Sequence, residues 1–168
     1  LATVPEGMPF VPGSTIPIQG QDHELRHTPE GRSGVVQESG ALLVSGGLEF
    51  FSRRVTDWLR REAKRQIASL VHAKAAKIGR KVHRITVRDQ QSRWGSCSSE
   101  GNLNFSWRLI FTPPEVLDYV VAHEVAHLQE MNHGKAFWSL VDTLTDHAAV
   151  GRSWLRNYGP NLHAYGAG

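Results

Sequence analysis

The residues best suited to metal chemistry are His123, Glu124 and His127, which form an H-E-x-x-H pattern. Residues four apart on an α-helix project from the same face, so the two imidazoles can reach a single ion. Two imidazoles in this arrangement suit zinc, and a glutamate beside them can serve as a general base. The spacing therefore predicts a zinc site on a helix, with an acid–base group next to the ion.

A third histidine, His133, is the candidate for the remaining protein ligand. Catalytic zinc sites normally have three protein ligands and one open coordination position. His133 lies beyond the expected helix, where a turn can bring its ring back to the ion. The bare pattern also arises by chance in helices that bind nothing, but residues 120–128 are largely apolar and predict a buried helix. Burying two histidines and a glutamate without a partner is costly, and a metal ion supplies that partner.

The single cysteine, Cys97, admits three interpretations. It cannot form an internal disulfide, which fits a reducing compartment, so we expect a cytoplasmic protein. It can pack as a small apolar residue, act as a nucleophile, or fill the fourth position of a purely structural zinc site. We favour packing, because a metal site already accounts for the histidines. Cysteine sulfur on the metal would instead indicate a binding module.

The length and composition of the chain are typical of a globular protein. Its 168 residues suffice for one medium domain or a domain with a small lobe, and 40% of them are hydrophobic and 21% charged. No apolar run approaches the roughly 20 residues that span a bilayer, and no signal peptide is visible. We therefore expect no membrane association.

Basic residues are concentrated over residues 53–65 and again over 80–93, in a chain whose formal net charge is +3. Such a concentration can contact nucleic acid or an acidic partner. Asp57 and Glu62 interleave with the basic residues, so a solvated helix face is the favoured interpretation. Nucleic acid stays an alternative partner.

The composition divides the chain into three parts. Residues 1–13 are rich in proline and glycine and predict a flexible arm. Residues 14–48 contain short β-forming runs separated by turns, which predict a small antiparallel β region. Residues 49–168 are expected to form the main domain. It begins with a helix over 49–78 that should pack against the helix carrying the histidines.

The stretch between these two helices predicts strands. Residues 84–89 and 102–107 alternate apolar and polar side chains, whereas 90–101 read as a polar turn. An edge strand beside a metal-bearing helix can bind an extended peptide by backbone pairing, and residues 102–107 are our candidate for it. The alternative is that they form an internal hairpin arm.

Three further side chains are candidates for contacts with the substrate or the transition state. Tyr119 lies one helical turn before His123, Arg93 precedes the candidate edge strand, and Asn104 lies within that strand. For Tyr119 and Arg93 a purely structural role is the favoured interpretation.

Several segments in the same order resemble the YgjP-like metallopeptidase-domain family, zinc-dependent hydrolases related to the SprT and WLM groups of zincins. The resemblance extends over about residues 49–162 and depends on residues 93–97, 104–109, 113–116, 118–121, 123–127, 132–133 and 137–138. It implies a zincin-like fold in which His123, His127 and His133 bind zinc and Glu124 is the catalytic carboxylate. It implies no particular substrate.

The combined prediction is an α+β protein, a zincin-like metallopeptidase domain with a small N-terminal β region, acting on a peptide or protein substrate. Glu124 would take a proton from a zinc-bound water as that water attacks the peptide carbonyl. The alternative is a zinc-stabilised, non-catalytic module that binds nucleic acid or a protein partner. The glutamate favours the enzyme, because a structural zinc site does not need it.

Overall fold

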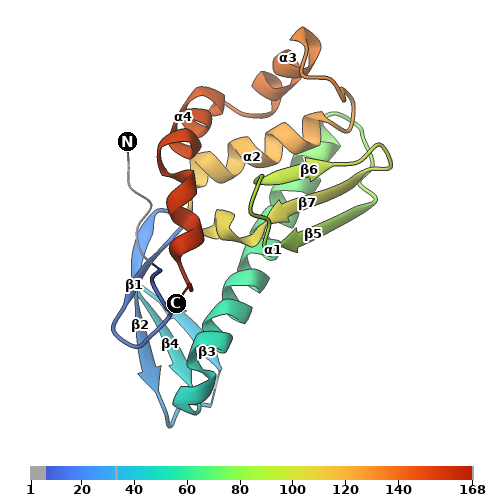
Figure 1. The fold of residues 1–168 in the computed structure, drawn as a ribbon. Coiled ribbons are helices and arrows are strands. Elements are labelled where there is room, and N and C mark those ends of the chain that lie inside the picture. Colours follow the sequence, from blue (N-terminus) through green and yellow to red (C-terminus); the bar gives the residue numbers. More distant parts are fainter. Residues whose placement is uncertain (1–6, 33, 168) are drawn as a thin grey trace.

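Four strands, a long helix, three strands and three helices follow one another in the computed structural model, which describes residues 7–32 and 34–167 (Figure 1). Their order is β1 (Thr15–Ile18), β2 (Gln21–Thr28), β3 (Val35–Glu38), β4 (Ala41–Ser45), α1 (Phe51–Lys77), β5 (Arg84–Arg88), β6 (Gly95–Cys97), β7 (Asn102–Ser106), α2 (Pro114–Ala126), α3 (Lys135–Leu144) and α4 (Ala148–Tyr158). Short 3-10 helices lie at η1 (Leu48–Phe50), η2 (Trp107–Phe111) and η3 (Gly159–Ala164). The predicted α+β class is confirmed.

The N-terminal sheet has the strand order β1-β2-β4-β3. The β1–β2 and β3–β4 pairs are antiparallel, as predicted, but β2 and β4 run parallel, so the sheet is mixed. Strand β4 is the most apolar of the four and is buried along most of its length. It therefore takes an interior position, and β2 and β3 become its two neighbours.

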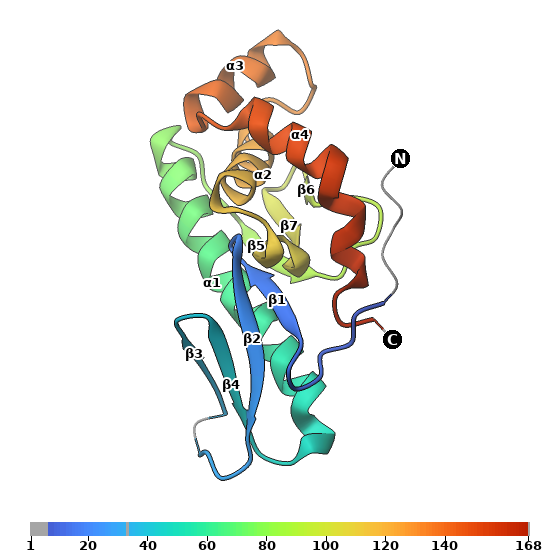
Figure 2. The same ribbon diagram turned by 90° about the vertical axis from the view of Figure 1, so that its left-hand side faces the viewer.

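The long helix α1 connects the two sheets. Its buried positions recur every fourth residue and form one apolar stripe: Phe51, Val55, Leu59, Ala63, Ile67, Val71 and Ala75. The beginning of α1 lies beside the N-terminal sheet, and its later turns lie behind the second sheet and along α2 (Figures 1 and 2). Helix α1 has 27 residues, but neither it nor any other described helix is long and apolar enough to cross a membrane.

The second sheet has the order β5-β7-β6, which corrects two predictions. The polar stretch 90–101 contains a strand, β6, that pairs antiparallel with β7. Strand β7, within the predicted edge strand 102–107, is the central strand, because β5 pairs with its other side. The strand at the edge beside α2 is therefore β6. Residues 102–107 correspond to the alternative stated above, an internal hairpin arm, and not to an edge strand.

The predicted flexible arm, residues 1–13, is only partly within the described residues, because residues 1–6 lie outside them. The N–H of Met8 donates to the carbonyl of Ala164 at 2.8 Å. Phe10 is only 2% exposed and belongs to the hydrophobic core. The described end of this segment therefore packs against the C-terminal residues, because an apolar side chain anchors it.

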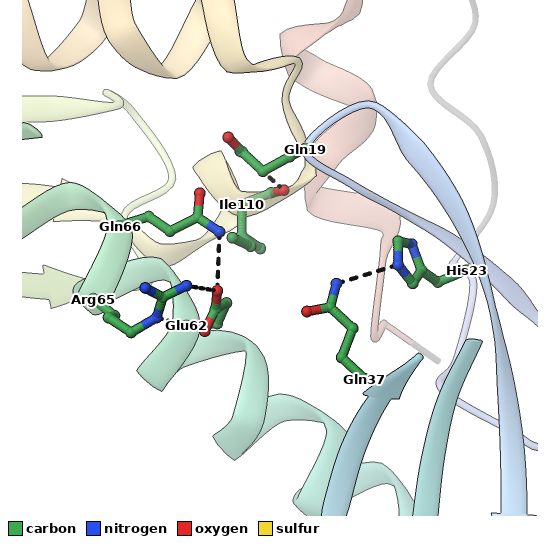
Figure 3. A network of polar contacts seen from close by, with 7 residues as sticks. All are labelled: Gln19, His23, Gln37, Glu62, Arg65, Gln66 and Ile110. Atoms are coloured by element: carbon green, nitrogen blue, oxygen red, sulfur yellow. Dashed lines mark hydrogen bonds and ion pairs between the residues drawn. The ribbon is translucent and has the colours of Figure 1, made fainter. Parts of the chain in front are cut away.

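Polar contacts fix the N-terminal sheet to the segment that leads into α2 (Figure 3). Gln19, in the turn between β1 and β2, donates its N–H to the carbonyl of Ile110 at 2.8 Å. Its side-chain Nε2 also donates to the carbonyl of Thr112 at 3.1 Å. Below this turn, the buried His23 lies 3.2 Å from Gln37 Nε2, across the sheet. The hydrogen bonds of Gln19 hold the chain in place immediately before the helix that carries His123.

Candidate metal centre

Helix α2 presents the H-E-x-x-H residues in its last turns. It begins with Pro114, at a position where the missing N–H has no helical partner anyway, and its last residue is Ala126, with His127 as the C-cap. Its apolar residues are buried, and the helix packs against α1, α3, α4 and β6. This packing fixes the rotation of α2 and therefore the direction in which His123 and His127 project.

The three histidines predicted as ligands lie together. His123, His127 and His133 each offer a ring nitrogen, and these atoms all lie within 4.8 Å of one another. The Nε2 atoms of His127 and His133 are 3.0 Å apart. Nitrogens bound to tetrahedral zinc at about 2.0–2.1 Å are about 3.3 Å from each other. The donor set and its spacing therefore fit one small cation such as zinc.

The other ring nitrogens have partners that orient the imidazoles. Nδ1 of His127 donates to the carbonyl of Glu130 at 2.9 Å, and Nδ1 of His123 donates to Oε2 of Glu124 at 3.1 Å. A carbonyl or carboxylate oxygen can only accept, so each Nδ1 carries the proton and each Nε2 keeps its lone pair for a metal. Burial lowers the pKa of His127, which further favours the neutral ring that metal binding needs.

Helix α3 supplies an aromatic wall behind the three rings. Phe137 stacks on His127 with ring centroids 4.4 Å apart and meets His123 edge-on at 5.0 Å. The ring centroid of Trp138 lies 5.8 Å from that of His123 and 6.3 Å from that of His133. These contacts exclude water from the back of the cluster and limit the movement of the rings. The apolar residues that follow His133 were the only sequence signal for this wall.

Glu124 lies between α2 and the edge strand β6. Its side chain is buried, with 5% of the residue exposed. A Cβ added at Gly95 would lie 2.8 Å from Cγ of Glu124 and 3.0 Å from Oε2. A larger residue at this position would displace the carboxylate, which accounts for the glycine at the start of the strand.

Two cavities flank Glu124, and both are bordered by Arg93, Gly95, His123 and Glu124. The larger has a volume of about 310 Å³ and is also bordered by Ser96, Cys97, His127, Met131 and His133. The smaller has a volume of about 230 Å³ and is also bordered by Trp94, Tyr119, Val120 and Leu155. The carboxylate therefore stands between a histidine-lined space and a largely apolar one.

The three additional candidate contacts have different outcomes. Arg93 borders both cavities, and Tyr119 borders the smaller one. Burial raises the pKa of the Tyr119 phenol, so its hydroxyl remains a protonated donor. Asn104 borders neither cavity, because it lies on the central strand β7 opposite Ser96. Leu155 and Trp94, which the sequence did not single out as contacts, border the smaller cavity instead.

Cys97 borders the larger cavity but is not a member of the histidine cluster. Its thiol lies 3.4 Å from the carbonyl of Ser98, to which it donates. Burial, together with the negative charge of Glu124, raises the pKa of this thiol to about 11. A thiol that stays protonated is a poor nucleophile at neutral pH, which favours the packing interpretation of Cys97 over the nucleophilic one.

Alkylation kinetics can check the protonation of Cys97. At pH 8 a pKa of about 11 leaves roughly 0.1% of Cys97 as the thiolate. A thiolate of higher pKa is a stronger nucleophile, but this compensates for only part of the fall in reaction rate. We expect iodoacetamide to modify Cys97 at least about tenfold more slowly in the folded protein than in the protein unfolded in urea. Mass spectrometry of samples taken over time measures both rates. Equal rates in the folded and unfolded chains would contradict a protonated, shielded thiol.

Comparisons with known proteins test the resemblance seen in the sequence. The family model described as YgjP-like, metallopeptidase domain, matches residues 2–158, which include α2 and all three histidines, and the predicted resemblance is confirmed. A search of curated proteins found no match. The solved zymogen of the metallopeptidase abylysin from Pyrococcus abyssi is 18% identical, with a TM-score of 0.49 over 54% of this chain and 92% of that one. The zymogen of jannalysin from Methanocaldococcus jannaschii is 17% identical, with a TM-score of 0.47 over 55% and 94%.

Proposed function

This chain belongs to the YgjP-like metallopeptidase family, and from that premise we propose that it hydrolyses peptide bonds with a zinc ion held by His123, His127 and His133. One observation carries the proposal: three imidazole nitrogens converge within 4.8 Å beside the buried carboxylate of Glu124. A structural zinc site normally fills its fourth position with another protein ligand. A cluster of three, next to an acid, instead suits a site that leaves one position for the reaction.

Glu124 is the acid–base group of the proposed reaction. When bound, zinc supplies a Lewis acid that lowers the pKa of water and polarises a carbonyl oxygen. Glu124 accepts the proton of the attacking water and returns it to the nitrogen of the leaving amine. Its Oε2 accepts the Nδ1–H of His123, so we assign the proton transfer to Oε1. The hydrogen bond to His123 therefore positions the carboxylate as well as the ligand ring.

The peptide chain is proposed to lie along β6. This strand pairs with β7 on one side, so the backbone groups of its other edge are available to an extended partner. All three residues of β6 border the larger cavity, next to His123 and Glu124. A peptide that extends the sheet at this edge brings its own carbonyls past the metal centre, as strand addition does in other peptide-binding sites.

The test is metal-dependent peptide hydrolysis. The protein is stripped with a chelator, dialysed, and incubated with a mixture of peptides with and without added zinc. We expect new peptide ends, identified by mass spectrometry, with added zinc and at least about 100-fold less cleavage in the stripped protein. Cleavage that persists unchanged after the metal has been removed would refute the proposal.

A further inference from the structure

The smaller cavity beside Glu124 differs from the histidine-lined one in the character of its walls. Trp94, Tyr119, Val120 and Leu155 form most of it, and Arg93 supplies a cation at its border. Tyr119 and Val120 lie one turn before His123 and Glu124 on α2, so they project to the same side of the helix. The apolar walls therefore continue directly from the residues assigned to the reaction.

Helix α4 approaches α2 closely enough to form one of these walls. A Cβ added at Gly151 would lie 2.6 Å from the Cβ of Tyr119, so only glycine permits this contact. Leu155 follows Gly151 by four residues and lies on the same face of α4. The close contact at Gly151 therefore sets the distance at which Leu155 faces the cavity.

Another wall of the cavity, Trp94, is held by the C-terminal segment. His163 stacks on Trp94 with ring centroids 5.2 Å apart and planes inclined by 14°. The buried Arg108 fixes that segment, because its Nη1 donates to the carbonyl of Leu162 at 3.0 Å and to that of Tyr165 at 2.7 Å. Its Nε also donates to the carboxylate of Asp89 at 2.9 Å. Packing therefore fixes the position of this wall as well.

The volume of the cavity limits what it can hold. Sites for whole small-molecule ligands usually measure about 300–1,000 Å³, and this one measures about 230 Å³. A single side chain fits such a space better than a complete ligand. Apolar walls favour an apolar side chain, whose surface leaves water there.

We propose that this cavity is a specificity subsite: it binds one apolar side chain of the substrate, next to the bond that is cut, and Leu155 sets the size that it accepts. The inference presumes the peptidase activity proposed above. It adds the class of substrate, namely peptides with an apolar residue beside the cleaved bond. It also assigns α4, which contributes no metal ligand, to substrate selection.

The experiment uses the zinc-loaded full chain and peptides that differ only at the residues on either side of one cleavage site. For one of these two positions, we expect kcat/KM to be at least about tenfold higher with leucine or phenylalanine than with glycine or lysine. Leu155→Ala should shift the optimum toward larger aromatic residues, and Leu155→Phe should shift it toward alanine. Val150→Ala, on the exposed side of the same helix, should leave the preference unchanged.

Binding provides a second readout that does not depend on turnover. In a Glu124→Gln background, calorimetry with the same uncleaved peptides should show the same ranking of affinities and the same shifts with Leu155. Zinc content should be equal in all variants. If the wild type cleaves peptides but neither Leu155 variant changes selectivity or affinity, the subsite is wrong and the peptidase proposal stands. If zinc-loaded wild type cleaves none of the peptides, the peptidase proposal fails and the subsite with it.

Discussion

Replacement of Glu124 by glutamine is expected to lower kcat/KM for peptide hydrolysis by about 1,000-fold while zinc binding is retained. Glutamine keeps the size of the side chain, and its carbonyl oxygen can still accept from His123 Nδ1, which is 3.1 Å from Oε2 in the wild type. It cannot take a proton from water, and acid–base groups of this kind contribute about 10²–10⁴-fold. Initial rates on a cleaved peptide and zinc per chain, measured on the same sample, give both quantities.

Glu115→Gln is the matched control for this substitution. Glu115 lies on the same helix and is exposed, at the opposite end from the histidines. Its replacement by glutamine removes the same negative charge. We expect it to retain nearly all activity. A Glu124→Gln protein that hydrolyses peptides at the wild-type rate would show that the proton is transferred elsewhere.

The parts of the site predicted from sequence depend on local geometry. His123, Glu124 and His127 follow each other on one helix, so the 3.6-residue period places them together whatever the rest of the chain does. The apolar stripe of α1 is local in the same sense and predicts that helix almost to its ends. His133 needed only a short turn after α2 to reach the cluster.

The parts that were missed depend on partners distant in sequence. Strand β6 is Gly-Ser-Cys, which has no β-branched or aromatic residue, and it is a strand because β7 pairs with it. Alternation of side chains identifies a strand but not its place in the sheet, so β7 was predicted at the edge and lies in the centre. Asn104, which we expected on an edge strand beside the substrate, therefore lies on the central strand, opposite Ser96 of β6.

The smaller cavity is a further case of this kind. Its walls come from the loop before β6, from α2 and from α4, and no periodic pattern relates these segments. From the sequence alone, Gly151 is expected only to lower the stability of the helix that contains it. The structure gives it a different role, because the missing side chain allows α4 to contact Tyr119. Such a role becomes visible only when the opposing residue is known.

His127→Ala is expected to lower zinc affinity by at least about 1,000-fold, and peptide hydrolysis should be lost with the metal. Loss of an outer hydrogen-bond partner alone typically costs 10–100-fold in metal affinity, and this substitution removes a proposed ligand itself. His127 is 7% exposed and held by Glu130 and Phe137, so the alanine variant leaves a gap that no neighbouring donor is positioned to fill. Competition with a chromophoric chelator measures the affinity directly.

Two controls make this result specific to the proposed ligand set. His72→Ala removes an exposed imidazole on α1 and should bind zinc as the wild type does. Cys97→Ser should also keep full affinity, because Cys97 lies outside the cluster of three histidines. If Cys97→Ser lost zinc and His127→Ala retained it, Cys97 and not His127 would be a zinc ligand. That result would favour a structural site with a sulfur ligand. Circular dichroism of each zinc-free protein separates loss of the ligand from loss of the fold.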